Sequence, residues 1–144
     1  MPSVTYTSPN IQIEGPILEV HFSISSELEK KYIEESKQIP VPIVVKSLID
    51  TGASSCTIRE DIPKKLGLEP IGKIKINTPS TKDHECFQYV MRMFMPLQGL
   101  TYEGVFTAVS LEGQDIEALI GRDLLQQGIF IYIGYMNQFT FSLM

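Results

Sequence analysis

The sequence predicts an all-β fold, either a barrel or a sandwich, with little helix. The main observation is a series of short segments in which apolar and polar side chains alternate, the pattern of a strand with one buried face. Gly, Pro and Asn interrupt these segments at short intervals, as turns between strands do. The length of 144 residues suits one domain with one hydrophobic core. We therefore expect a single domain over residues 1–144, built from many short strands.

In the first third of the chain, alternation predicts strands at residues 11–14 and 17–24, with a Gly-Pro pair between them. Ser26-Glu-Leu-Glu29 then matches a capping box, which predicts the start of a helix. Residues 27–38 carry charges of both signs, so we expect a short surface helix or an excursion between two strands. This solvated insert needs no function of its own. The β-branched run at residues 43–49 predicts the strand that follows.

Two further segments predict short helices. Asp61–Gly67 offers an Asp as cap, a Pro in the first turn and a Gly at the end. Arg122–Gln127 is closed by a glycine in the same way. The other alternating segments predict strands at residues 56–58, 73–77, 86–95, 102–111, 129–133 and 139–143. In the long strand, one face carries Phe87, Tyr89, Met91, Met93 and Met95, and the row of three methionines is expected in the core.

Composition excludes several classes of protein. A net charge of −5 argues against a nucleic-acid partner, because phosphate-binding surfaces need clustered Lys and Arg. No apolar run reaches the roughly 18 residues of a membrane-spanning helix, and no secretory signal precedes the first strand. We expect a cytoplasmic protein with no membrane partner. Two cysteines, Cys56 and Cys86, are too few for a disulfide scaffold; free thiols are expected, and a single bridge between them stays open.

The segment Leu48-Ile-Asp-Thr-Gly-Ala-Ser-Ser55 carries the clearest chemistry. Amide hydrolysis needs an activated water and a proton for the leaving group. Two close carboxylates that share one proton supply both, because like charges so near cannot both ionise and the pair titrates as a unit. Asp50, at the end of an apolar strand, is the candidate for one such carboxylate. The Gly52 amide can donate to it, and the Thr51 hydroxyl can lock the turn.

A second segment, Ala118-Leu-Ile-Gly-Arg-Asp-Leu-Leu125, is an apolar strand that ends in Gly and leads into a short helix. In their order and spacing, the two segments resemble those of the retropepsin-like aspartic proteases, the single-domain family that includes the retroviral proteases. The similarity covers roughly Pro42 to Gly134. It implies an acid-protease barrel, with one short helix after the Ile-Gly motif and a flap hairpin over the cleft.

The resemblance also implies roles for the residues that match. Asp50 would be catalytic, in a turn where Thr51 interlocks with its mate across a two-fold axis and Ala53 lines the cleft floor beside Gly52. Ser54 and Ser55 stand where retroviral members often have acids, and they are expected to contact substrate. The segment that threads behind the turn would give structural support through Ile120, Gly121, Arg122 and Asp123. Arg122 is expected as an ion-pair residue, and Asp123 as a cap at the start of the short helix.

Only one Asp of this chain has the setting of a catalytic residue, so the resemblance implies a homodimer with Asp50 facing its mate. Residues 73–87 lie where the family places its flap. The expected tip, from Asn77 to Lys82, contains a stiffening Pro instead of glycines. Asn77 and Thr78 are its expected substrate contacts. An ordinary polar hairpin without ligand contact stays open as the alternative.

Other reactive side chains fit structural roles better. His84 and Cys86 share a strand face, but no second pair of ligands is evident, so we expect neither a metal nor another cofactor. Cys56 is expected to be a buried thiol. The aromatic residues of the last two strands belong either to the core or to a dimer interface: Phe130, Tyr132, Phe139 and Phe141.

We therefore expect an aspartic endopeptidase that acts on a peptide or protein substrate as a homodimer. The alternative is a catalytically silent module of the same fold that dimerises or binds peptides, because fold does not fix function. The intact Asp50-Thr51-Gly52 turn favours the enzyme, since a scaffold gains nothing from two carboxylates at its axis.

Overall fold

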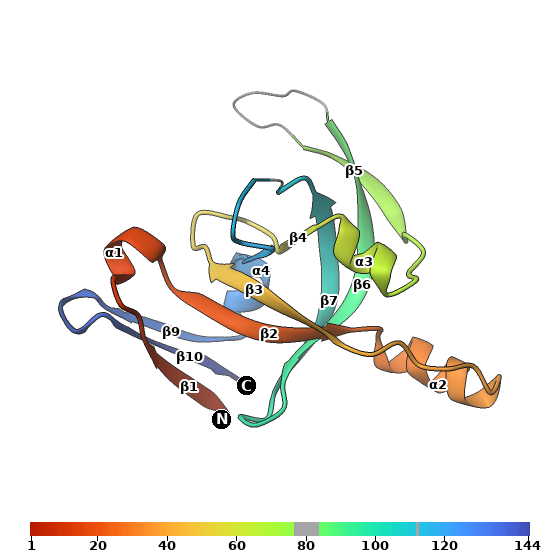
Figure 1. Cartoon of the computed structure of the whole chain (residues 1–144), viewed down its shortest axis with the longest axis horizontal. Coiled ribbons are helices and arrows are strands. Elements are labelled where there is room, and N and C mark those ends of the chain that lie inside the picture. Colours follow the sequence, from red (N-terminus) through yellow and green to blue (C-terminus); the bar gives the residue numbers. More distant parts are fainter. Residues whose placement is uncertain (77–83, 112) are drawn as a thin grey trace.

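The structure is a computed structural model that describes residues 1–76, 84–111 and 113–144, and it is mostly β (Figure 1). The strands are β1 (Ser3–Thr7), β2 (Ile17–Ser23), β3 (Ile43–Ile49), β4 (Thr57–Arg59), β5 (Gly72–Ile76), β6 (His84–Met95), β7 (Leu100–Val109), β8 (Ala118–Ile120), β9 (Gly128–Ile133) and β10 (Gln138–Leu143). The helices are α1 (Ile11–Glu14), α2 (Ser26–Glu34), α3 (Asp61–Lys65), α4 (Arg122–Leu125) and the 3-10 turn η1 (Gly134–Met136). No helix of the described residues is long and apolar enough to cross a membrane.

Six strands form a closed barrel in the order β2-β3-β8-β4-β7-β6. The ring closes because β6 also pairs with β2, at His21 opposite Phe94. Strand β5 adds to the outer part of β6, and the two extend away from the barrel (Figure 1). The predicted all-β barrel is therefore confirmed, and the strand pattern follows from alternating side chains that place one face of each strand inside.

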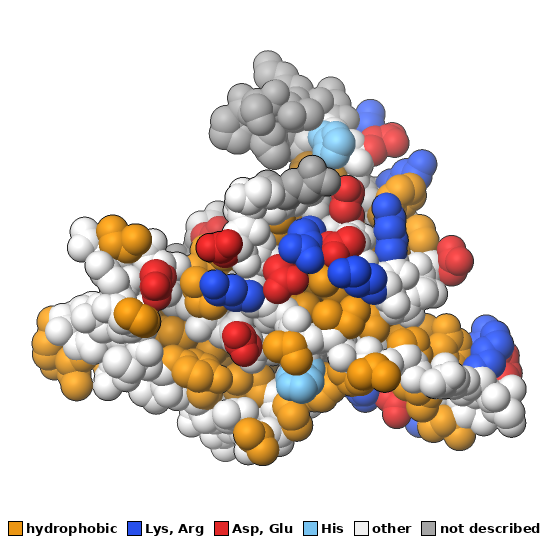
Figure 2. All heavy atoms as spheres, viewed as in Figure 1, with side chains coloured by type: hydrophobic (Ala, Val, Ile, Leu, Met, Phe, Trp, Pro, Cys, Tyr) orange, Lys and Arg blue, Asp and Glu red, His pale blue; other side chains and the backbone are white. Residues whose placement is uncertain are grey.

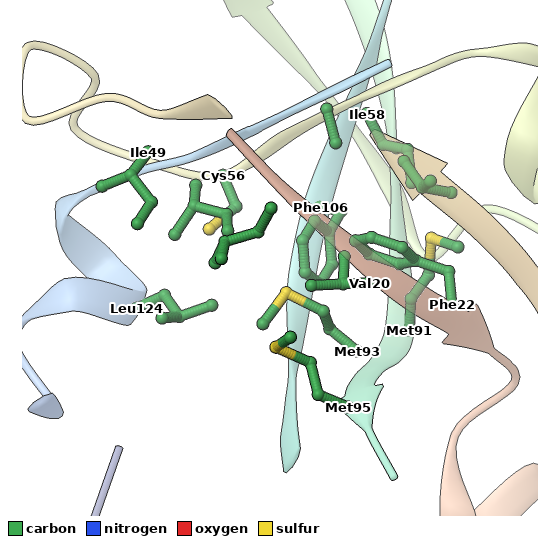
Figure 3. Packing of buried hydrophobic residues seen from close by; sticks show 14 of the residues in the cluster. Val20, Phe22, Ile49, Cys56, Ile58, Met91, Met93, Met95, Phe106 and Leu124 are labelled. Atoms are coloured by element: carbon green, nitrogen blue, oxygen red, sulfur yellow. The ribbon is translucent and has the colours of Figure 1, made fainter. Parts of the chain in front are cut away.

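A second sheet has the antiparallel order β1-β10-β9 and joins the two ends of the chain. It pairs Thr5 with Thr140 and Phe139 with Tyr132. Its inner face adds Val4, Phe139 and Phe141 to the same buried cluster as the barrel residues. Figure 3 shows the barrel part of this cluster, in which Phe22 packs edge-on against Phe106 between the methionines of β6. One core thus connects both sheets.

The predicted strand at residues 11–14 is wrong, because this segment forms the single helical turn α1. The Asn10 side chain accepts a hydrogen bond from the Ile13 amide, and Gly15 ends the turn with a φ of 79°. Asn137 holds the turn in place by accepting from the Ile11 amide over 3.0 Å. A local cap at Asn10 therefore outweighs a two-residue alternation.

The charged insert is a helix as predicted, although its cap lies one residue earlier. Ser25 rather than Ser26 accepts from the Leu28 amide, while Ser26 bonds to Glu103 on β7. The helix buries none of its side chains and projects from the barrel (Figure 1). A second helix start also differs from prediction: no side chain caps α3, because the Asp61 carboxylate binds Arg59 instead.

The long strand β6 keeps its predicted core face only within the barrel. The three methionines predicted in the core are buried, as is Tyr89, whereas Phe87 on the same predicted face is 44% exposed. Residues 84–87 of β6, which precede Gln88, pair with β5 outside the barrel. The core does not extend there, so their side chains on the core face are not covered. Cys86, on the opposite face, is buried instead.

Candidate active site

Asp50 is the first residue after β3, and the backbone around it forms a tight turn. The Asp50 amide donates to the Ile120 carbonyl over 2.9 Å, which continues the parallel pairing of β3 with β8. The Ala53 amide then donates back to the Asp50 carbonyl over 3.1 Å. Strand β3 thus places Asp50 at one end of the barrel, and the closed turn fixes the orientation of its backbone.

The Asp50 carboxylate is partly exposed and is held by its own turn. The Gly52 amide donates to Asp50 Oδ1 over 2.9 Å. A Cβ at position 52 would stand 3.1 Å from that oxygen, so glycine lets the amide approach without crowding. Thr51, Ser54 and Ser55 are exposed around it. The carboxylate therefore has a fixed orientation and remains open to water or to a ligand.

The segment that follows β8 lies directly behind this turn, as predicted. The Arg122 amide donates to the Ala53 carbonyl over 2.9 Å, and Arg122 Nη1 donates to the Thr51 carbonyl over 2.7 Å. The resemblance implied an ion pair for Arg122, but its guanidinium contacts the Thr51 backbone carbonyl instead. A Cβ at Gly121 would come within 2.5 Å of the Ser55 carbonyl carbon, so only glycine allows this packing.

Asp123 was predicted to cap α4, but Gly121 occupies the cap position without a side-chain hydrogen bond, and Asp123 lies within the first turn. Its Oδ1 accepts from the Leu124 amide at the start of α4 over 2.8 Å. The same carboxylate accepts from the Cys56 amide, with N–O distances of 3.1 and 3.2 Å, and from the Cys56 thiol over 3.1 Å. Asp123 therefore faces the end of the Asp50 loop and is engaged there as an acceptor.

Cys56 is the residue of this site that sequence reasoning assigned only to the core. Its side chain is fully buried, and its Sγ accepts from the Gly121 amide over 3.3 Å. Burial, with the hydrogen bond and charge of Asp123 as smaller causes, raises the pKa of the thiol to about 12. Both cysteines are free thiols in the structure. The only sequence signal for Cys56 was its place at the end of the loop.

The structure thus brings Asp50, Thr51, Gly52 and Ala53 together with the Ile120–Asp123 segment. Asn77 and Thr78 lie outside the described residues, so the predicted hairpin is described only at residues 73–76 and 84–87. In the parts of the chain that are described, no three His, Cys, Asp or Glu side chains are grouped to hold a metal ion. One chain therefore supplies a single catalytic candidate, the Asp50 carboxylate, which is partly exposed and fixed in orientation.

Comparisons with known proteins agree with this geometry. Residues 42–124 match the family model described as aspartyl protease, a range that contains both the Asp50 turn and the segment behind it. A crystal structure of a retropepsin-like aspartic protease from Rickettsia conorii is similar, with a TM-score of 0.55 and 14% sequence identity. The similarity covers 96% of this chain and 89% of that one, and it confirms the predicted retropepsin-like fold. No curated protein matches the chain.

Proposed function

Because the chain belongs to the aspartyl protease family, we propose that it is an aspartic endopeptidase that works as a homodimer. The observation that carries this proposal is the Asp50 carboxylate, which is partly exposed and fixed by the Gly52 amide over 2.9 Å. Each chain contributes one such group, and a second copy brings the other. The proposed dyad consists of the two Asp50 side chains, one from each chain.

The two carboxylates share one proton and hold a water between them. The ionised carboxylate accepts a proton from the water as its oxygen attacks the scissile carbonyl carbon, while the protonated one gives its proton to the carbonyl oxygen. The C–N bond of the tetrahedral intermediate then breaks as the leaving nitrogen takes a proton from one carboxyl group and a hydroxyl of the intermediate gives its proton to the other carboxylate. Acid and amine products leave, and the dyad returns with one proton.

The uncharged sheet β1-β10-β9 supports a homodimer. None of its residues is Asp, Glu, Lys or Arg, although the chain has 29 charged residues. Among the described residues β9 pairs on one side only, and Ile129, Ile131 and Tyr132 are about half exposed. In Figure 2, charged side chains gather over the centre, whereas the tip of the β9–β10 hairpin at the left is hydrophobic and uncharged.

An edge strand that pairs with its own copy places identical residues near each other across the axis, so any charge there would meet a like charge. Edges that must stay unpaired commonly carry Lys or Pro, and β9 has neither. We therefore assign β9 as the dimer edge, with Phe130 and Tyr132 on one of its faces. Phe139 and Phe141 are core residues by their burial.

For the substrate, an extended peptide that pairs as an added strand suits this arrangement. Ser54 and Ser55, which are exposed beside Asp50, are the proposed contacts on the floor side. The β5–β6 hairpin is the proposed flap, with Asn77 and Thr78 as contacts near its tip. Closure of this flap would exclude water and orient the scissile bond.

The test compares wild type with Asp50→Asn in cleavage of a quenched fluorogenic peptide library from acidic to neutral pH. Asp50→Asn should lose essentially all cleavage, because an amide cannot share the dyad proton. Asp115→Asn, a change at an exposed loop carboxylate, is the matched control and should cleave like wild type. Equal cleavage by wild type and Asp50→Asn would overturn the proposal. Binding of peptides without cleavage would identify the silent module.

A further inference from the structure

The Cys56 thiol lies where the Asp50 loop and the segment after β8 meet, and it contacts both. Its Sγ donates to Asp123 Oδ1 over 3.1 Å and accepts from the Gly121 amide over 3.3 Å. Its own amide donates to the same carboxylate over 3.1 Å. Figure 3 shows the side chain between Ile49 and Leu124, at one end of the buried cluster. Cys56 is therefore a polar junction inside an apolar layer.

The junction is connected to Asp50 through a short run of backbone. At one end of the loop, the Asp50 amide donates to the Ile120 carbonyl, and in the middle the Ala53 carbonyl accepts from the Arg122 amide, both over 2.9 Å. At the other end, Cys56 is bound to Gly121 and Asp123. The loop is thus attached at its start, middle and end to four consecutive residues, so a shift at Cys56 is passed to the turn that aims Asp50.

The chemistry of the junction depends on a protonated thiol. Asp123 forms no ion pair with a Lys or Arg of the described residues, so its charge is compensated by N–H and S–H donors. Burial raises the pKa of both Cys56 and nearby Tyr102 to about 12, with the charge of Asp123 as a further cause. The thiol is therefore protonated, and a hydrogen-bond donor, at neutral pH. Without it, the carboxylate loses a donor and the Gly121 amide loses its acceptor.

We propose that Cys56 is a positioning residue for Asp50, which acts by holding the Asp123 carboxylate and the Gly121 amide against the end of the active-site loop. The catalytic part of this inference rests on the proposed protease function; the positioning part does not. A thiol used in this way is more than core filling, because a side chain of similar volume without a donor and acceptor would not replace it.

The positioning part is tested by amide hydrogen exchange, read by NMR at Asp50 and Arg122. Cys56→Ala should speed exchange at both amides by about tenfold or more, whereas Cys56→Ser, which keeps a donor and an acceptor, should stay within about threefold of wild type. Cys86→Ala is the matched control, since it removes the other buried thiol outside this junction, and both amides should keep their protection. Unchanged protection in Cys56→Ala would overturn the inference.

The catalytic part is tested on one fluorogenic peptide that the wild type cleaves. Cys56→Ala should lower kcat about ten- to a hundredfold with KM within about twofold, because the dyad is misplaced while the peptide still binds. Cys56→Ser should restore kcat. In an Asp123→Ala background, Cys56→Ala should add little further loss, since both changes break the same contact.

Three results separate the possible failures. Full additivity of Cys56→Ala and Asp123→Ala, or an unchanged kcat in Cys56→Ala, would overturn the inference while the protease function stands. A wild type that cleaves nothing would overturn the protease function, and the exchange experiment then decides the positioning role alone. If Cys56→Ala does not fold, Asp123→Ala decides: exchange as slow as wild type in Asp123→Ala would contradict the role of the carboxylate.

Discussion

Gly121 illustrates how one missing side chain defines the surroundings of Asp50. The position has extended backbone, with φ of −93° and ψ of −177°, so conformation does not demand glycine. The demand comes from space, since a Cβ would lie 2.5 Å from the Ser55 carbonyl carbon. Because that atom is backbone, it cannot rotate away as a flexible side chain would. The Ile-Gly motif is thus a packing requirement of the loop that carries Asp50.

Asp61 gives the chain a specific dependence of stability on pH. Its carboxylate binds the Arg59 guanidinium with an Nη2–Oδ2 distance of 3.0 Å and Lys65 Nζ with 3.1 Å. The hydrogen bond from Arg59, with a smaller effect of Lys65, lowers the pKa of Asp61 to about 2. A lowered folded-state pKa stabilises the fold above the usual carboxyl pKa of about 4, and this contribution is lost as pH falls through the folded-state value.

We therefore expect the stability difference between wild type and Asp61→Asn to be largest above about pH 5 and to shrink towards about pH 2. Urea unfolding at a series of pH values measures it. Asp115→Asn, at an exposed carboxylate, should keep a constant small difference from wild type over the same range. A difference between wild type and Asp61→Asn that does not change with pH would contradict the assignment to Arg59 and Lys65.

At this scale the sequence predicted the acidic group, its glycines and the Gly52 amide as its donor, but missed the contact of Cys56 with Asp123. Asp50, Gly52 and Gly121 are visible as a pattern, because each needs a particular residue type at a particular local spacing. The contact of Cys56 with Asp123 joins residues 67 positions apart. Nothing local to either residue encodes that pairing, which arises from the fold itself.

Among the elements, α2 is the one that depends least on burial. It has no buried residue, and its connection to the barrel includes an ion pair between Glu29 and Arg92 of β6, with an Oε2–Nη2 distance of 2.9 Å. Both side chains are less than one-third exposed. The pair is therefore better protected from water than most surface pairs, and it fixes where the insert leaves the barrel.

Glu29→Ala should lower the free energy of unfolding by about 1 kcal/mol, because it leaves a half-buried guanidinium without its carboxylate. Glu27→Ala, two residues away on the exposed side of the same helix, should change it by less than about 0.5 kcal/mol. Equilibrium urea unfolding of the two variants provides the comparison. Equal effects would show that the contact with Arg92 does not anchor the helix.

The elements were predicted well where alternation was long and poorly where it was short. Strands such as β5 and β10 match their predicted ranges within one or two residues, because five or more residues establish the period. The segment at residues 11–14 has only two apolar positions, and the capping oxygen of Asn10 decides its structure. Phe87 shows a different limit: the alternation of β6 is real, but the barrel ends before the strand does.

For the whole molecule, the proposed dimer makes a direct prediction at the β9 edge. Ile131, near the middle of β9, would lie close to its own copy across the two-fold axis. Ile131→Lys should therefore yield a monomer without cleavage activity, because two ammonium groups would meet at the interface. Light scattering coupled to gel filtration gives the mass, and the fluorogenic peptide gives the activity.

Ile13→Lys is the matched control, since this isoleucine is 77% exposed on α1, outside the uncharged sheet. It should remain dimeric and active. A wild type that is monomeric at micromolar concentration would contradict the dimer itself. A dimeric Ile131→Lys variant would leave the dimer standing and show that another surface forms it.

The pairing of β1 with β10 also has a consequence for how the protein comes into being. Ser3 lies opposite Ser142, and the Leu143 amide donates to the Pro2 carbonyl over 3.1 Å. The sheet thus joins the first strand to the last, a contact of high sequence separation that forms late in folding. During synthesis, β1 has no partner strand until residues 138–143 have left the ribosome. On the proposed function, the sheet that presents the β9 edge is complete only once residues 138–143 have been made, so a nascent chain lacks this dimer surface, and hence a second aspartate, before then.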